Sequence, residues 1–490
     1  MLHNCRAEPS SWLVPWLAAA AIVALPTLPA VAQTTSPCPN GAINVAAGSS
    51  IQQAVNKAKA KAVFCLKNGT HRMQVVQPKQ GQQFYGEGKT ILNGSRELTK
   101  FTRSGSHWVT KEQKLTNRRS GDCGRKFPTC NFVEVVFIND KPLGRALNRD
   151  DLAPGLFYYD AGAASIYLAD NPRNKTVEVT ISQYAFFAEV SDVVIDNVTI
   201  EKYANPAQNG AIDAQYGPGW QIRNCEVRMT GGAGISVGTD TTVKQCKIHN
   251  NGQIGITGAG HNIHIEGNTV WTNNTRGFSH GWESGGIKIS LANDTIFRGN
   301  HVYDNRGPGI WCDGHCRRAI YEDNRVVRND DAGIYHEISY QTTIRNNIVR
   351  NNGRANEGWF WDAEILIAGS EGAEIHNNRT TSKKGACGIM LIDQGRLEDD
   401  GYVFKTRNNN VHSNVMTFVD APCAGGVSDV SRGDANYGLI ENGNNRFNRN
   451  TYRVPKAARN FRFVWGQRED IDWAEFRSLG QEANGRMVRY

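Results

Sequence analysis

Beyond its first 32 residues, the 490-residue sequence has no apolar run long enough to cross a membrane. We therefore expect that no segment of the mature chain associates with a membrane. The sequence also lacks runs of like charge, which argues against nucleic-acid binding, and the formal net charge of +8 is only a weak lean towards acidic glycans. With 50 glycines and 39% hydrophobic residues, the composition fits an ordered chain with an extended core.

Residues 1–32 have the features of a secretory signal. An apolar run from Leu13 to Leu28 is interrupted by Pro15 and Pro26, and the segment ends in Ala-Val-Ala at Ala32. The run is too short and too broken for a retained anchor, and a small-residue ending is typical of a cleavage site. We expect cleavage after about Ala32 and a soluble protein that is secreted or periplasmic.

Cysteine content agrees with export. Of 11 cysteines, Cys5 would leave with the signal, so ten remain, and an even number in an exported chain suggests disulfides. Cys123 and Cys130 are expected to close a loop. Cys225 and Cys246 occupy equivalent places in neighbouring repeats, about 4.8 Å apart if the repeats stack as strands, and are also expected to bridge.

A short unit recurs through the middle of the chain. It is an Asn, an apolar residue two places later and a second Asn three places after that. The apolar positions are Val227, Ile248, Val270, Val302, Val326 and Ile348, at spacings of 21, 22, 32, 24 and 22 residues, with a later copy at Val411. The first Asn is Asn268, Asn300, Asn324, Asn346 and, in the later copy, Asn409.

This period, in short β-branched runs broken by Asn and Gly, predicts a solenoid of stacked strands. An Asn that can bond to its copy on the next turn favours a right-handed parallel β-helix, with Asn268, Asn300, Asn324 and Asn346 in one internal row. A propeller would need longer blades, and leucine-rich repeats a Leu scaffold.

The predicted fold is therefore all-β, a parallel β-helix with an inserted β-sandwich-like subdomain and caps at both ends. Ser50 followed by an amphipathic pattern from Ile51 to Ala58 predicts a capping helix. Between 101 and 182 the repeat disappears and alternating strand patterns take its place. The expected divisions are a signal at 1–32, a cap and first turns at 33–100, the insert at 101–182, the β-helix at 183–440 and a C-terminal cap at 441–490.

Two acids recur at the same place of successive repeats. Segment 309–313 reads Gly-Ile-Trp-Cys-Asp and segment 333–337 reads Gly-Ile-Tyr-His-Glu, 24 residues apart. Alternation along a strand points Trp311 and Asp313 outward, and likewise Tyr335 and Glu337, with Lys288 at the matching place of the preceding repeat.

Carboxylates stacked about 4.8 Å apart repel each other, so their recurrence at this place indicates a functional role. A retaining glycosidase uses such a pair, because one carboxylate attacks the anomeric carbon and the other protonates the leaving oxygen. A solvated pair or a structural Ca²⁺ site is the alternative. The stack alone does not assign the two roles.

Two long insertions, at 276–283 and 356–362, bracket the repeats that hold these acids. Loops that leave one corner of a solenoid form the walls of a groove. Trp282, Trp359 and Trp361 lie in these loops and Glu364 just beyond, so we expect them to line a groove with Trp311 and Tyr335, where aromatic faces stack on sugar rings. Simple packing of the loops is the competing interpretation of the tryptophans.

Segment 309–313, Asn324, Asn329, Glu337 and the Arg-Asn-Asn at 345–347 together resemble the catalytic turns of a β-xylosidase family of glycoside hydrolases. That family has a pectin-lyase-like β-helix and an outer β-sandwich. The resemblance covers about 300–350 and implies that Asp313 is the nucleophile and Glu337 the acid/base. Cys312, Cys316 and His336 depart from the family pattern, which leaves the substrate open.

Two other functions stay open. A polysaccharide lyase or epimerase acting on uronate-containing glycans would use Lys288 or His315 as proton acceptor, often with Ca²⁺. A non-catalytic glycan-binding protein would use the aromatics without the acids. The favoured hydrolase needs no cofactor and no metal, and its partner is a poly- or oligosaccharide; the sequence does not give an oligomeric state.

Overall fold

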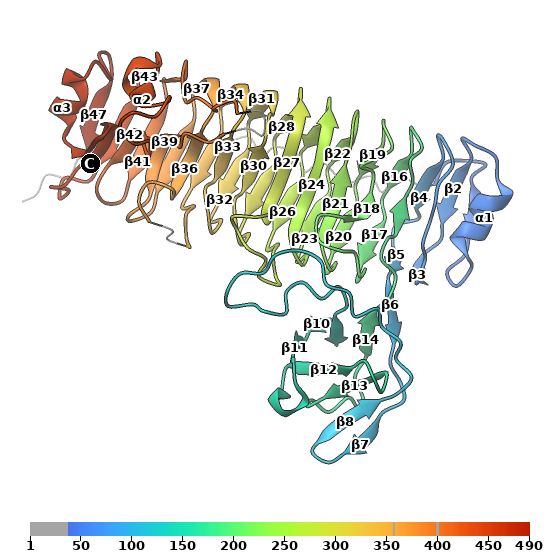
Figure 1. Ribbon diagram of the computed structural model, residues 1–490. Helices are drawn as coiled ribbons and strands as arrows, with labels where there is room; N and C mark the ends of the chain where they lie inside the picture. Colours follow the sequence, from blue (N-terminus) through green and yellow to red (C-terminus); the bar gives the residue numbers. More distant parts are fainter. Residues whose placement is uncertain (1–37, 356–357, 398–400) are drawn as a thin grey trace, which may run out of the picture. The chain divides into compact units, whose positions relative to one another are not determined.

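The computed structural model describes residues 38–355, 358–397 and 401–490, so the predicted signal peptide lies outside the described residues. Most of these residues form a parallel β-helix whose turns contribute strands to three faces (Figure 1). The predicted all-β solenoid is confirmed. None of the helices in the described ranges has the length and apolarity of a membrane span.

The first face carries the two recurring acids. Its strands are β15 (Phe186–Phe187), β18 (Gly210–Asp213), β21 (Ala233–Val237), β24 (Ile254–His261), β27 (Gly285–Asn293), β30 (Ile310–Asp313), β33 (Ile334–Glu337), β36 (Ala363–Ala368), β39 (Cys387–Asp393), β42 (Cys423–Ser428) and β45 (Arg462–Gly466).

The second face follows it in each turn and begins nearer the N-terminus. Its strands are β1 (Ile43–Val45), β2 (Val63–Leu66), β4 (Gln83–Gly86), β16 (Val194–Asp196), β19 (Gln221–Arg223), β22 (Thr242–Lys244), β25 (His264–Glu266), β28 (Ile296–Arg298), β31 (Arg317–Glu322), β34 (Tyr340–Arg345), β37 (Glu371–His376), β40 (Asn410–His412) and β43 (Arg446–Asn448).

The third face closes each turn. Its strands are β3 (Gly69–Arg72), β5 (Thr90–Asn93), β17 (Thr199–Glu201), β20 (Glu226–Arg228), β23 (Lys247–His249), β26 (Thr269–Trp271), β29 (His301–Tyr303), β32 (Arg325–Val327), β35 (Ile348–Arg350), β38 (Arg379–Ser382), β41 (Val415–Phe418), β44 (Thr451–Val454) and β47 (Arg486–Arg489).

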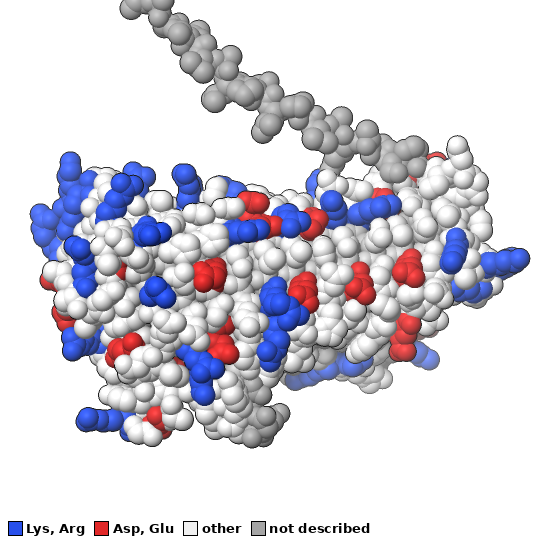
Figure 2. Space-filling model, turned by 90° about the horizontal axis from the view of Figure 1, so that it is seen from above, with Lys and Arg blue, Asp and Glu red and all other residues white. Residues whose placement is uncertain are grey.

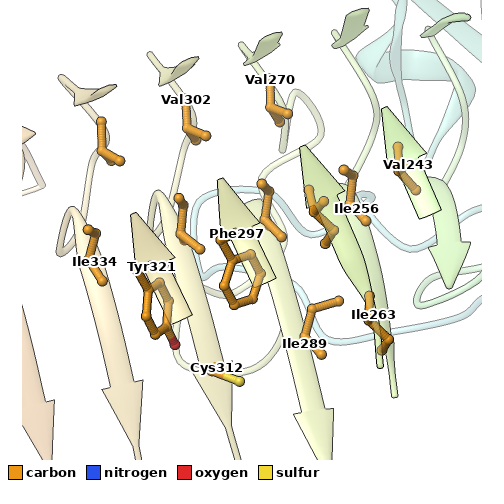
Figure 3. Packing of buried hydrophobic residues seen from close by; sticks show 14 of the residues in the cluster. Val243, Ile256, Ile263, Val270, Ile289, Phe297, Val302, Cys312, Tyr321 and Ile334 are labelled. Carbon is orange, nitrogen blue, oxygen red and sulfur yellow. The ribbon is translucent and has the colours of Figure 1, made fainter. Parts of the chain in front are cut away.

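Apolar columns run along the inside of the helix (Figure 3). On the first face the in-register partners are Ile235, Ile256, Ile287, Ile310, Ile334, Ile365 and Ile389. On the third face they are Val227, Ile248, Val270, Val302, Val326 and Val349. Each such side chain is almost fully buried, which contributes about 2 kcal/mol per residue. The stacking of identical turns therefore supplies the core.

A ladder of buried Asn side chains runs beside the third-face column. The Asn268 side-chain amide donates to Asn300 Oδ1 (3.1 Å), Asn300 to Asn324 (3.0 Å) and Asn324 to Asn347 (3.0 Å). The predicted row is correct for its first three members and wrong for Asn346. Asn346 is exposed with φ of 58°, so it is the turn residue that precedes the ladder.

The predicted apolar marker of this turn is off by the same one residue, because Val349 and not Ile348 pairs with Val326. The shift also replaces the closing Asn351 by Asn352, to which Asn329 donates (2.9 Å). The later copy is displaced as well. Asn414 continues the first row through Asn378 (3.0 Å), whereas Asn409 lies in a separate row with Asn445 (3.0 Å).

This register predicts opposite effects for two adjacent residues. Asn347 donates to Tyr321 O (2.9 Å) and Asn378 Oδ1 (2.9 Å) and accepts from the backbone of Asn324 (3.0 Å). Asn347→Ala leaves these buried groups without partners and should lower the free energy of unfolding by on the order of 3 kcal/mol. Asn346→Gly, which keeps a positive φ accessible, should change it by less than about 1 kcal/mol in the same denaturation experiment. Equal effects of the two variants would contradict the register.

Helices cover the ends of the apolar columns. Helix α1 (Ile51–Lys57) begins after Ser50, whose hydroxyl accepts from Gln53 N (3.2 Å), as predicted. At the other end, α2 (Leu439–Asn442) and α3 (Trp473–Ser478) lie close to β45, and β46 (Arg468–Ile471) pairs antiparallel with it. Phe476 of α3 is fully buried and stacks on Phe463 (5.0 Å between centroids), so the last turn is not open to solvent.

The insert between β5 and β15 is made of two small sheets. One contains β6 (Ser95–Glu97), β9 (Val136–Ile138), β10 (Lys141–Pro142) and β14 (Val177–Thr180). The other contains β7 (Thr102–Ser104), β8 (His107–Thr110), β11 (Gly144–Arg145), β12 (Leu156–Asp160) and β13 (Ser165–Leu168). Side chains of both sheets form one apolar cluster, so the insert is sandwich-like, and it begins at β6, earlier than the predicted residue 101.

Four disulfides are present among the described residues: Cys38–Cys65, Cys123–Cys130, Cys312–Cys316 and Cys387–Cys423. The predicted Cys123–Cys130 loop is confirmed. The predicted bridge between Cys225 and Cys246 is wrong, because both are free thiols buried in the core. Each thiol lies against a backbone carbonyl instead, Cys225 Sγ at Arg223 O (3.2 Å) and Cys246 Sγ at Lys244 O (3.4 Å).

Charges are mixed on the outer surface. Figure 2 shows Lys and Arg side chains interspersed with Asp and Glu on the face that it views. On the second face, for example, Glu322 lies between Arg298 (2.5 Å) and Arg345 (2.6 Å) of the neighbouring strands. Such pairs neutralise the charges locally, in keeping with the lack of charged runs in the sequence.

Candidate functional site

The two recurring acids lie side by side on the first face. Asp313 at the end of β30 pairs in register with Glu337 at the end of β33, with Ser290 before them and Ala368 after. Ile310 and Ile334 of the same strands point into the core, so alternation turns the acids outward as expected. The Cys312–Cys316 disulfide closes the turn that follows Asp313.

Lys288 holds Asp313 from the preceding turn. Its Nζ lies 2.7 Å from Asp313 Oδ2 and 3.0 Å from a carboxylate oxygen of Glu283, and it donates to Trp282 O (3.1 Å). The ammonium also lies 3.5 Å from the centre of the Trp311 ring. Asp313 keeps 21% of its side chain exposed while Lys288 keeps 3%, so a buried cation supports a carboxylate that solvent or a ligand can reach.

Glu337 has a different environment. Its side chain is 8% exposed, and Oε1 lies 2.7 Å from Arg396 Nη1. Burial and, next, the neighbouring Asp313 charge raise the pKa of Glu337, against the opposing effects of Arg396 and of a hydrogen bond with Tyr335. The two acids therefore lie in different environments: Asp313 contacts the buried Lys288 cation, whereas burial raises the pKa of Glu337.

His336 points into the core beneath this pair. It is fully buried, and its Nδ1 lies 3.1 Å from the Tyr321 hydroxyl. Burial lowers the pKa of His336 to about 3. The residue is therefore a neutral core histidine and does not face the site.

Trp311 in β30 and Tyr335 in β33 belong to the same strands as the two acids, but both side chains are buried. Their rings stack at 5.2 Å between centroids, and each side chain is buried. They share an apolar cluster with Phe360 and Leu366, against which Trp361 packs. The two rings therefore pack against neighbouring side chains and leave little exposed surface for a sugar ring.

The other predicted site residues fall in separate places. Trp282 packs against Phe278, in favour of loop packing, while its carbonyl accepts from Lys288. Trp359 is 36% exposed and donates to Glu469 (3.1 Å). His315 lies two residues beyond Asp313, beside Phe404 (5.2 Å between centroids). Residues 356 and 357 of the second insertion lie outside the described ranges.

Glu364 does not line the site, contrary to expectation. It is fully buried in β36, and its carboxylate accepts from the Asn352 side-chain amide (2.6 Å). In register it occupies the place of Gly333, whose Cβ would lie 2.7 Å from the same amide nitrogen. Glu364 thus ends one Asn ladder.

The buried acid makes stability depend on pH. Burial raises the pKa of Glu364 to about 8, against the hydrogen bonds from Asn352, whereas an unfolded glutamate titrates near ~4.3. The folded state therefore binds this proton more tightly, so the stability it contributes is complete below about pH 4 and is lost as the pH rises towards 8. Glu364→Gln should flatten the fall in free energy of unfolding between pH 5 and pH 8, measured with urea, and the exposed Glu374→Gln should not. An unchanged slope in Glu364→Gln would contradict this assignment.

Two residues of the site were not predicted from the sequence, because neither lies in a repeated segment. Arg396 follows β39 and is 59 residues from its partner Glu337. Glu283 ends an insertion and contacts Lys288 of the next strand. Within the described ranges, no group of three or more His, Cys, Asp and Glu has metal-site geometry.

Comparison with known proteins identifies the fold. A family model described as a right-handed beta helix region matches residues 158–281 and 277–379. The chain is a right-handed parallel β-helix protein. No curated protein sequence matches it.

Solved structures with a similar fold include the following two. A complex of XylC with xylose matches with a TM-score of 0.65 and 15% identity, over 86% of this chain and 83% of that one. The A-module of the Azotobacter vinelandii mannuronan C-5 epimerase AlgE6 matches with a TM-score of 0.52 and 14% identity, over 89% and 93%. At these identities the likeness establishes the β-helix fold alone.

Proposed function

We propose that this β-helix protein is an exported, carbohydrate-active enzyme and that it is a retaining glycoside hydrolase. Asp313 is the nucleophile and Glu337 the acid/base. The observation that carries the proposal is the in-register pair of carboxylates with opposite environments, Asp313 on a buried Lys288 and Glu337 buried with a raised pKa. The likeness to XylC, whose structure holds xylose, supports a glycan substrate.

The chemistry follows from this pair. Asp313 attacks the anomeric carbon while Glu337 gives its proton to the departing glycosidic oxygen, so a covalent glycosyl ester forms as the C–O bond breaks. Glu337, now ionised, takes a proton from water, which attacks the same carbon and releases Asp313. Adjacent strands lie about 4.8 Å apart, which suits the roughly 5–5.5 Å between carboxyl groups of retaining enzymes.

Lys288 serves this chemistry as a cation. It stabilises the carboxylate of Asp313 before attack, and Arg396 stabilises Glu337 once its proton has left. In a lyase or epimerase Lys288 would need a free lone pair, but it already donates to Glu283, Asp313 and the Trp282 carbonyl. The hydrolase is therefore the function that these contacts favour.

Export is supported by the four disulfides among the described residues, because such bonds persist in oxidising compartments. It also suits a polymeric or oligomeric glycan substrate.

A glycan panel separates the reaction classes. Purified protein is incubated with neutral and uronate-containing oligosaccharides, with and without EDTA, and both new reducing ends and the absorbance of unsaturated uronates are recorded. We expect reducing ends without that absorbance, and no effect of EDTA. Unsaturated products that disappear with EDTA would establish a lyase instead, and glycan binding without turnover would establish a binding protein.

A further inference from the structure

The third face carries charge of one sign over most of its length. Its strands from β23 to β47 contain no Asp or Glu, whereas their Lys and Arg residues are Lys247, Arg325, Arg350, Arg379, Arg453, Arg486 and Arg489. The preceding strand, β20, ends this stretch with Glu226, which pairs with Arg228 (2.7 Å). The basic surface is therefore assembled by the fold from residues that lie far apart in the sequence.

Strand pairing places four of these side chains in one outward row, which we call the cation column. Its members are Lys247, Arg325, Arg379 and Arg486. Each lies next to an inward residue of its strand, as Arg325 lies next to the buried Val326, so alternation turns it towards solvent. The turns between them hold, in the same row, Thr269, His301, Ile348, Val415 and Thr451.

The four cations are exposed and are not used in ion pairs of the fold. None of them has a carboxylate partner within 38–355, 358–397 and 401–490. At the neighbouring corner of the same turns the arginines are paired, Arg328 with Asp304 (2.6 Å) and Arg354 with Asp330 (2.8 Å). The positive charge of the cation column is therefore left available to a partner.

His301, which lies in the column beside Arg325, responds to this charge. Burial and, next, the positive charges of Arg325 and Arg328 lower the pKa of His301, although Asp304 opposes them. The field at this place is thus positive even where an acid is near.

The column is long and narrow. Eight steps between neighbouring strands, at about 4.8 Å each, give it a length of about 38 Å. Successive cations are separated by three, two and three steps, or about 14, 10 and 14 Å. Guanidinium groups bind carboxylates through charge-assisted hydrogen bonds, and here they lie in single file. A partner that contacts all four cations is therefore an extended chain with acidic groups along its length.

We propose that the cation column binds a linear acidic polysaccharide, which lies along the third face parallel to the axis of the β-helix. The surface is separate from the Asp313 site, because that site belongs to the first face. The proposal therefore does not depend on the hydrolase.

The same face disfavours two other extended polyanions. Single-stranded nucleic acids stack their bases on open aromatic rings, but the outward His249, Trp271 and Tyr303 cover one another, at 4.0 and 5.9 Å between centroids. An anionic membrane is bound with the help of inserted apolar side chains, but Ile348 and Val415, the apolar members of the column, are half-buried.

Calorimetric titration of the full chain with polygalacturonate tests the proposal, and a neutral galactan of equal length is the control. At about 50 mM salt we expect binding of polygalacturonate alone, which weakens as salt is added. The triple variant Arg325→Gln/Arg379→Gln/Arg486→Gln should weaken this binding about tenfold or more.

A matched variant removes the same charge elsewhere. Lys57→Gln/Lys59→Gln/Lys89→Gln changes three exposed side chains of the N-terminal turns and should leave polygalacturonate binding unchanged. Thermal unfolding checks that both triple variants fold, and Arg379→Gln alone, which alters a single exposed side chain, should weaken binding severalfold.

Several results would overturn the proposal. They are absence of polygalacturonate binding, equal binding of the galactan, or equal losses in the two triple variants. Binding that is lost in Arg396→Gln but kept in the third-face triple variant would place the polymer on the first face. Tighter binding of duplex DNA or of phosphatidylglycerol vesicles than of polygalacturonate would assign the column to another partner. Cleavage of short oligosaccharides should be unchanged in the third-face triple variant, so these results are distinguishable from a failure of the hydrolase.

Discussion

Asp313→Asn is expected to lower turnover by about 10³-fold or more while leaving the fold intact. The amide keeps the shape of the side chain but cannot attack the anomeric carbon, and removal of the nucleophile eliminates a step that no neighbour replaces. The measurement is kcat on whichever glycan of the panel is cleaved, with thermal unfolding as the check on folding. Asp294→Asn is the matched control, since it breaks an exposed ion pair with Arg318 (2.7 Å) away from the site and should leave kcat unchanged.

Activity in Asp313→Asn within tenfold of the parent protein would remove Asp313 from the mechanism. Loss of activity in both Asp313→Asn and Asp294→Asn would instead point to a general effect of lost ion pairs.

Glu337→Gln should show a dependence on the leaving group. Cleavage of the natural glycan should fall by about 10²–10⁴-fold, because the departing oxygen receives no proton. An aryl glycoside with an acidic phenol needs no such help, so its first step should persist, and added azide should speed the second step and give a glycosyl azide. The raised pKa of Glu337 adds a pH test: the parent activity should decline as the pH rises through that pKa, and this decline should be absent from aryl-glycoside cleavage by the variant.

Equal losses on both substrates, with no response to azide, would show that Glu337 acts through structure rather than by proton transfer. Tyr335→Phe is the matched control, because it removes one hydrogen bond to Glu337 and keeps the acid. That variant should shift the pH profile of the enzyme and leave the azide response unchanged.

The solenoid could be predicted from the sequence because apolar and Asn residues recur at regular spacing. The register at residues 346–352 was predicted one residue too early because two Asn residues are adjacent there. Each ladder Asn follows a residue with positive φ, as in Gly299-Asn300 and Asp323-Asn324. In the Asn346-Asn347 pair either residue fits the amide pattern, but only the second follows such a turn. The preceding turn residue, rather than the spacing of apolar residues, is the signal that fixes the register.

The predictions for Glu364 and for the Cys225–Cys246 pair were wrong for a common reason, because at these positions the repeat holds a residue with a different structural role. Glu364 stands where earlier repeats have Gly333 and Gly309, at the corner where a side chain meets the Asn ladder, so simple alternation placed its carboxylate wrongly. Cys225 and Cys246 stand in the Asn row, where each thiol lies against a backbone carbonyl and the two stay free. Arg396 belongs to no repeat and contacts Glu337 only through the fold, so no spacing in the sequence marks it.

The most direct test of the central claim is a covalent intermediate on Asp313. Glu337→Gln is mixed with an aryl glycoside of the cleaved sugar, quenched in acid, digested and examined by mass spectrometry. The account predicts one added glycosyl unit on the peptide that contains Asp313, and none when Asp313→Asn is combined with Glu337→Gln. A glycosyl unit on another residue, or turnover of the aryl glycoside with inversion at the anomeric carbon and no adduct, would contradict it.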